Sequence, residues 1–144
     1  MKRLALALLL SAQIGTALAG AETATVRVQV ADAPGLTFNH VARNTLTLTT
    51  PWGTQTAVFG GTPYSPDPQH YWNHLFPLTL NVRVPGGVGS GSYPLKASAQ
   101  LFLCDQRAHL CTVKTAEASG DLNLSGSSAR LELLLSVPTF KLSP

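Results

Sequence analysis

Apolar and polar residues alternate along most of the chain after its N-terminal apolar run, which is the pattern of half-buried β-strands. The alternation is clearest in residues 23–31, where Val26, Val28 and Val30 are separated by polar residues, and in residues 77–84. Similar patterns bounded by turn-forming residues predict further strands at 45–49, 54–59, 93–103, 111–116, 119–124 and 129–137. Residues 60–69 carry two glycines and three prolines, so we expect no regular structure there.

About seven to nine short strands joined by turns, with no helical periodicity beyond the N-terminal segment, indicate an all-β domain. The pattern predicts an antiparallel β-sandwich of immunoglobulin-like type. Residues 85–91 are rich in glycine and are expected to connect two strands flexibly. Because no internal repeat or linker composition interrupts the chain, residues 20–144 are predicted to form a single domain.

The first 19 residues have the three parts of a removable signal peptide. Lys2 and Arg3 are followed by the apolar run 4–10, and Ala17-Leu18-Ala19 provides small residues for cleavage. A membrane anchor is the alternative, but the uninterrupted apolar run is much shorter than the roughly 20 residues that span a bilayer. We therefore expect a periplasmic or secreted protein that does not itself span a membrane.

The charge of the chain argues against nucleic acid or an anionic membrane surface as a partner. The formal net charge is +3, but Lys2 and Arg3 supply two of these charges, so residues 20–144 carry a net charge of +1. Only 12% of the residues are charged, and no cluster of lysine and arginine stands out. This balance suits a β-protein outside the cytoplasm.

The two cysteines, Cys104 and Cys111, are the strongest chemical signal in the sequence. Six residues separate them, so a hairpin turn centred on Arg107-Ala108 would place them directly opposite each other on adjacent strands. Exported thiols tend to pair, and we expect a disulfide between them. Either this disulfide is a structural staple, worth about 2.5 kcal/mol by loop entropy, or it is accessible and takes part in exchange.

The residues beside the cysteines leave that choice open. Arg107, His109 and Lys114 would stabilise a cysteine thiolate, whereas Asp105 would oppose it. Structural disulfides in sandwich domains usually join the two sheets across the core, which a bond within one hairpin does not do.

The segment around the cysteines resembles the N-terminal periplasmic domain of DsbD-type thiol:disulfide interchange proteins. The approach strand begins Tyr93-Pro94-Leu95-Lys96-Ala97 and ends at Cys104, and a short polar turn leads to Cys111 on the return strand. Residues 76–82 and the glycine-rich connection before Tyr93 are also similar to this family. The similarity extends over residues 44–124 and is centred on the cysteine hairpin.

The resemblance implies an immunoglobulin-like sandwich in which Cys104 and Cys111 alternate between dithiol and disulfide, with either as the nucleophile. Such a domain accepts electrons from a membrane protein and passes them to thioredoxin-like periplasmic proteins; here the resemblance covers only the periplasmic domain, so the donor would act in trans. In the family, five residues separate the cysteines, and the sixth one here should shift the hairpin register or require a bulge. Family members also cover the pair with an aromatic loop, for which residues 64–76, with Tyr71, Trp72 and Phe76, are the candidate.

Two other hypotheses about function remain beside thiol–disulfide exchange. One is a binding or assembly module in which the disulfide only holds the hairpin, with the aromatic cluster Tyr71, Trp72 and Phe76 serving ordinary packing. The other is a metal-handling protein that uses His70 and His74, spaced i and i+4 beside Asp67. A Cys104–His109–Cys111 metal cluster is disfavoured because exported thiols oxidise. No cofactor is predicted, and the sequence contains neither a nucleophile elbow nor a phosphate-binding loop.

Overall fold

The alternating segment at residues 23–30 forms strand β1 (Thr23–Val30), which is the centre of a three-stranded sheet. The computed structural model describes residues 23–138. β1 pairs antiparallel with β7 (Leu78–Arg83) and parallel with β10 (Ala129–Leu135). Val26, Val28 and Val30 point inward and are at most 2% exposed, because alternate residues of a strand face the same side of the sheet.

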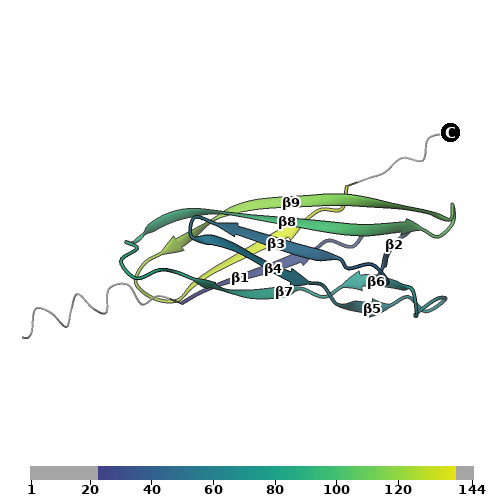
Figure 1. The fold of residues 1–144 in the computed structure, drawn as a ribbon, viewed down its shortest axis with the longest axis horizontal. Coiled ribbons are helices and arrows are strands. Elements are labelled where there is room, and N and C mark those ends of the chain that lie inside the picture. The colour runs from purple at the N-terminus through teal and green to yellow at the C-terminus, as the bar shows by residue number, and fades with distance from the viewer. Residues whose placement is uncertain (1–22, 139–144) are drawn as a thin grey trace, which may run out of the picture.

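The second sheet is built around the long strand β8 (Gly91–Asp105), as Figure 1 shows. One edge of β8 pairs along its whole length with β9 (Leu110–Leu124). Its other edge pairs first with β3 (Thr45–Thr50) and then with β2 (Leu36–Asn39). β4 (Gly53–Val58) extends the sheet beyond β3, and β6 (Tyr71–Leu75) and β5 (Gly61–Pro63) extend it beyond β2.

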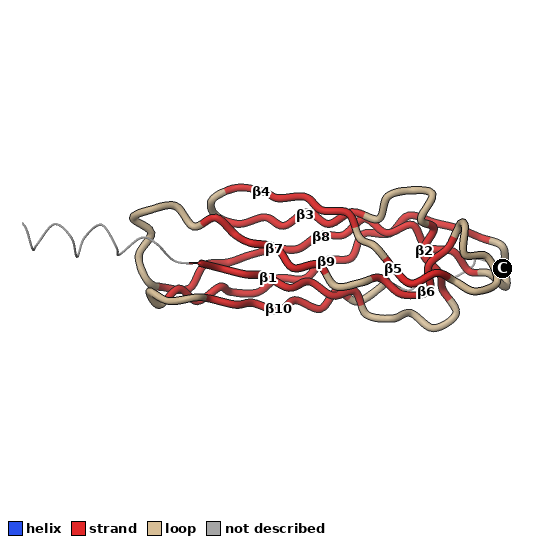
Figure 2. The backbone as a smooth tube through the Cα atoms, turned by 90° about the horizontal axis from the view of Figure 1, so that it is seen from below, coloured by secondary structure: helices blue, strands red, loops and turns tan. Residues whose placement is uncertain are grey.

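The two sheets pack face to face and form an elongated sandwich (Figure 2). Between them lie the inward residues of both sheets, among them Val26, Val28, Leu46, Leu48, Phe38, Leu95, Leu101, Leu103, Leu122 and Leu135. The prediction of an all-β, immunoglobulin-like sandwich is confirmed at the level of this architecture. The β1–β10 pair is the one parallel pairing among the described strands.

The structure corrects the strand pattern in three places. Residues 60–69 were expected to hold no regular structure, yet Gly61–Pro63 form β5. β5 is an edge strand that pairs only with β6, and an edge strand tolerates a proline because its outer side needs no hydrogen-bond donor. β2 and β6 were not predicted, since each is short and depends on pairing with distant chain. The two strands expected at 111–116 and 119–124 are one continuous strand, β9.

The predicted signal peptide, residues 1–19, lies outside the described residues. Within residues 23–138, no helix has the length and apolar character needed to cross a membrane.

Candidate functional site

The cysteine hairpin is formed by β8 and β9, whose 15 residue pairs run from Gly91–Leu124 to Asp105–Leu110 without a shift of register. Its turn is shaped by Asp105, whose Oδ1 accepts hydrogen bonds from the backbone N–H groups of Arg107 (2.9 Å) and Ala108 (3.2 Å). Aspartate favours turns because its side chain binds backbone donors two or three residues ahead. His109 closes the turn with a φ of 53°.

Cys104 and Cys111 lie directly opposite each other in this ladder and are joined by a disulfide. Their Cα atoms are 4.0 Å apart, close to the short spacing of a cross-strand pair that exchanges no backbone hydrogen bonds. The predicted pairing is therefore confirmed. The expected bulge or register shift is absent from the described hairpin, because the six intervening residues are accommodated by a four-residue turn, 106–109, flanked by the pair Asp105–Leu110.

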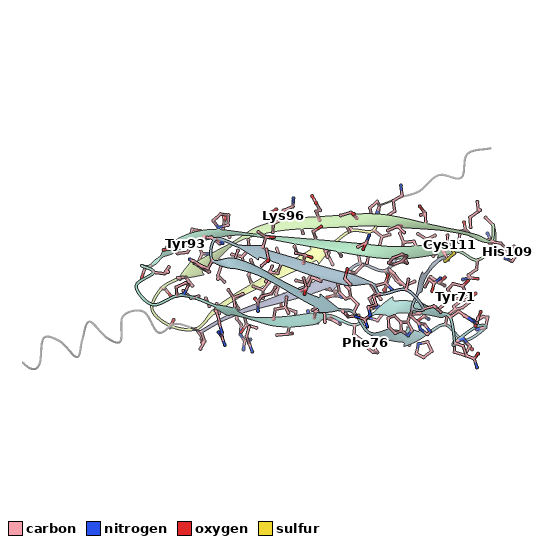
Figure 3. The ribbon with its side chains drawn as sticks, viewed as in Figure 1. Tyr71, Phe76, Tyr93, Lys96, His109 and Cys111 are labelled. Atoms are coloured by element: carbon pink, nitrogen blue, oxygen red, sulfur yellow. A yellow bond between two sulfur atoms is a disulfide. The ribbon has the colours of Figure 1, made fainter. Side chains whose placement is uncertain are left out.

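The disulfide lies on the outer face of the sheet, near the tip of the hairpin. Leu101 and Leu103 point into the core, so Phe102 and Cys104 on the alternate positions point outward. Figure 3 shows Cys111 and His109 together at one end of the molecule and Tyr93 towards the other.

The two cysteines differ in exposure although they are bonded to each other. Cys104 is 2% exposed, whereas Cys111 is exposed on the outermost strand. Thr37, the neighbour of Cys104 on β2, is itself buried and donates a hydrogen bond from Oγ1 to the Cys104 carbonyl oxygen at 3.3 Å. Gln106 Nε2 in turn donates to Thr37 Oγ1 at 2.8 Å. β2 and the turn thus enclose Cys104 from the side away from β9.

Asn44 is fully buried and bridges the point where β8 changes neighbours from β3 to β2. Its Oδ1 accepts the backbone N–H of Phe102 at 2.8 Å, and its Nδ2 donates to the Asn39 carbonyl oxygen at 3.0 Å. The Asn44 carbonyl oxygen also accepts the Phe59 backbone N–H at 2.9 Å. Residues 40–44 form no strand beside β8, and the asparagine amide supplies the hydrogen bond to Phe102 that a paired strand would otherwise make. It thereby fixes the backbone of β8 two residues before Cys104.

A groove of about 440 Å³ opens beside the hairpin turn. It lies between the loop that follows β1, the strand β2 and the turn of the hairpin. Its lining includes Asp32, Thr37, Tyr64, Asn73, Gln106 and Arg107. The groove is therefore on the Cys104 side of the disulfide, separated from Cys111 by β8 and β2.

The aromatic residues proposed as a cap lie on or beside β6. Trp72 pairs with Phe38, packs against the core and stacks on the His40 ring at 4.7 Å between centroids. Tyr71 makes an edge contact with Tyr64. In the sheet, β2 separates β6 from Cys104. Figure 3 places Tyr71 at the same end of the molecule as Cys111. Phe76, which is 50% exposed, lies nearer the middle.

The histidines of the metal hypothesis bind separate carboxylates. His70 Nδ1 is 2.8 Å from Asp67 Oδ1, and His74 Nδ1 is 2.6 Å from Asp32 Oδ1. His74 lies within β6, where successive residues advance by about 3.3 Å, so the i, i+4 spacing does not bring the two rings together as it would on a helix. Within residues 23–138, no three His, Cys, Asp or Glu side chains are grouped closely enough to hold a metal ion.

Sequence reasoning identified the disulfide and its hairpin but not Thr37, Asn44 or Gln106. The turn signal at Asp105 was visible in the sequence, whereas the contacts of Thr37 and Asn44 join residues more than 50 positions apart. No protein-family model matches this chain, and no curated protein matches its sequence.

Proposed function

We propose that this protein is an extracytoplasmic thiol–disulfide exchange domain that uses Cys104 and Cys111 as its redox pair. The observation that carries the proposal is the unequal exposure of the pair: the Cys111 side of the disulfide is open, and the Cys104 side is enclosed. Strained or exposed disulfides tend to be the labile or catalytic ones, whereas structural disulfides typically have lower reduction potentials. The bond also closes a loop of only eight residues within an extended ladder, which limits its loop-entropy contribution to about 2.5 kcal/mol.

The unequal exposure assigns a role to each cysteine. A thiolate of a partner dithiol attacks Cys111 Sγ and forms a mixed disulfide, while Cys104 leaves as a thiolate and takes up a proton. The second partner thiolate then attacks the partner's own sulfur in the mixed disulfide and releases Cys111. The partner becomes a disulfide and this protein a dithiol, with two electrons and two protons transferred. In the reverse direction, the Cys111 thiolate attacks a substrate disulfide, forms a mixed disulfide and releases one substrate thiolate. The Cys104 thiolate then attacks Cys111 Sγ, which re-forms the Cys104–Cys111 bond and releases the second substrate thiolate.

The partners that suit this chemistry are thioredoxin-like periplasmic proteins on one side and a membrane electron donor, supplied by another chain, on the other. In the described part of the chain, the two cysteines are the groups that would carry this reaction. Exchange of this kind needs no cofactor. The proposed location outside the cytoplasm is supported by the predicted signal peptide and by the persistence of disulfides in oxidising compartments.

Single-cysteine variants test the proposal. We expect the Cys111 thiol of Cys104→Ser to react with 5,5′-dithiobis-(2-nitrobenzoate) at least about tenfold faster than the Cys104 thiol of Cys111→Ser, because only Cys111 is open to a reagent. Titration of the wild-type disulfide in glutathione buffers supplies the second measurement. A reduction potential below about −300 mV marks a structural bond and would exclude exchange with the common redox pools.

A further inference from the structure

On β9, Cys111 and Val113 direct their backbone N–H and C=O groups away from β8, towards the open edge of the sheet. On β8, the Phe102 N–H binds Asn44 Oδ1 and the Cys104 carbonyl accepts from Thr37 Oγ1, so both residues direct their polar groups away from β9. Phe102–Val113 and Cys104–Cys111 are therefore the pairs that exchange no backbone bonds, in agreement with the 4.0 Å Cα distance. It follows that Val113 and Cys111 present their N–H and C=O groups outward.

This edge is open in the part of the chain that the structure describes. β9 has only β8 as a hydrogen-bonded neighbour. Core contacts from β10 reach β9 near Gly120, where Leu131 and Leu133 pack, which is well away from Cys111 along the strand. The outward side chains Cys111, Val113 and Thr115 are uncharged, and β9 contains no proline. An edge with free donors and acceptors is a template for an added strand.

We infer that residues 111–115 of β9 receive the cysteine-bearing segment of the redox partner as an added antiparallel strand; this inference rests on the proposed function. A partner cysteine opposite Cys111 would occupy a hydrogen-bonded pair, with a Cα distance of about 5.5 Å. That distance is within the range of a disulfide, so strand addition by itself brings the two sulfurs within bonding reach.

The same pairing places the partner thiolate in line with the sulfur–sulfur bond of Cys104 and Cys111. Cys104, Cys111 and the partner cysteine fall in one row across three strands, with all three side chains on the outer face. A thiolate attacks a disulfide along the sulfur–sulfur axis, from the side opposite the leaving sulfur. From the β9 edge this axis is free, whereas β2 covers its other end. The partner thiolate bonds to Cys111 Sγ, and Cys104 departs with the electron pair of the broken bond.

Lys114 determines which charge is favoured at the facing position of the partner strand. The Lys114 side chain is on the opposite face of β9 from Cys111 and Val113 and is partly buried. It has no ion-pair partner within residues 23–138. A lysine on an edge strand discourages indiscriminate pairing. A strand that pairs with β9 therefore gains from an acidic residue opposite Lys114, which is three positions before its cysteine in antiparallel register.

The probe is a synthetic peptide of this design, acetyl-Thr-Glu-Val-Thr-Cys-Thr-amide, carried as its mixed disulfide with thionitrobenzoate. It reacts with Cys104→Ser protein, whose Cys111 thiolate attacks the peptide sulfur and releases the coloured thionitrobenzoate. The corresponding glutathione mixed disulfide is the reference, because it is too short to form a strand. The ratio of the two rates separates strand addition from the intrinsic reactivity of Cys111.

The test variant is Val113→Pro, which removes one outward N–H and no bond of the β8–β9 ladder. We expect the peptide to react about tenfold more slowly, and the glutathione reference to change less than twofold. Val113→Thr is the matched control and should leave both rates unchanged. A peptide with N-methylvaline, tested on protein that keeps Val113, gives the same information without altering the fold. Lys114→Glu should slow this peptide and favour one with lysine in place of its glutamate.

An unchanged peptide rate in Val113→Pro and with the N-methylated peptide would overturn the inference while leaving the proposed function intact. Dimerisation of the protein through this edge, abolished by Val113→Pro, would assign β9 to a second copy and would also overturn it. Failure of the proposed function has a different signature, namely an unreactive Cys111 towards both substrates together with a structural reduction potential of the wild-type bond.

Discussion

Cys104 and Cys111 share one bond but occupy different environments, and the difference comes from their neighbours in the sheet. Cys104 is on an interior strand, flanked by Thr37 on β2, whereas Cys111 is on the outermost strand. The alternation of a strand puts both on the outer face, so burial of Cys104 depends on what covers that face. Its neighbours there include Thr37, whose hydroxyl donates to the Cys104 carbonyl oxygen, and Gln106, which donates to Thr37.

Asn44 is the residue on which the site's support depends most directly. Asn44→Ala would leave the Phe102 N–H and the Asn39 carbonyl without this partner at a partly buried position. A buried unsatisfied polar group costs about 1–3 kcal/mol, so we expect the free energy of unfolding in urea to fall by about 2–5 kcal/mol. Asn123→Ala removes a surface hydrogen bond to Ser92 and is the matched control, with an expected change within about 0.5 kcal/mol. Equal effects of the two substitutions would contradict this role.

At the scale of elements, the molecule is organised around the β8–β9 hairpin and the short strands beside it. β2 and β3 follow the same edge of β8, interrupted by residues 40–44, and each acquires its own outer neighbour. The chain then leaves β6 and enters β7 in the other sheet after Phe76 and Pro77. The β5–β6–β2 part of the sheet thus supports Thr37, and through it the covered side of the disulfide.

Gly61 tests the packing of this part of the sheet. A Cβ atom at Gly61 would collide with the His74 carbonyl oxygen and would lie 2.8 Å from the Trp72 ring. We expect Gly61→Ala to lower the free energy of unfolding by about 1–3 kcal/mol, as overpacking does. At Gly60 the added atom would meet only Phe76, at an ordinary 3.5 Å, so Gly60→Ala serves as the control in thermal and urea denaturation. A similar loss of stability in both variants would show that the close approach at Gly61 is not the cause.

At the scale of the whole molecule, we expect the sandwich to hold without the disulfide. The core is filled by residues of both sheets, and the ladder of β8 and β9 continues far beyond the cysteines. The proposed exchange role requires this independence, because the reduced form would have to remain folded between reactions.

Reduction should therefore leave the fold intact. We expect dithiothreitol to lower the free energy of unfolding by no more than about 2.5 kcal/mol, the loop-entropy value for this short loop, with an unchanged far-ultraviolet circular dichroism spectrum. The Cys104→Ser, Cys111→Ser double variant should match the reduced protein in urea denaturation. Loss of strand signal on reduction without denaturant would instead identify the disulfide as a structural requirement and would weigh against exchange.

The sequence by itself determined the all-β class, most strands and the pairing of Cys104 with Cys111, because alternation, turn residues and a short hairpin are local properties. Only the tertiary structure decided which sulfur is enclosed, that residues 61–63 join the sheet, that Trp72 packs on His40, and that His70 and His74 bind separate carboxylates. These depend on which strand lies beside which. Such pairings join residues distant in the chain, and the periodicity of one strand carries no information about its neighbour.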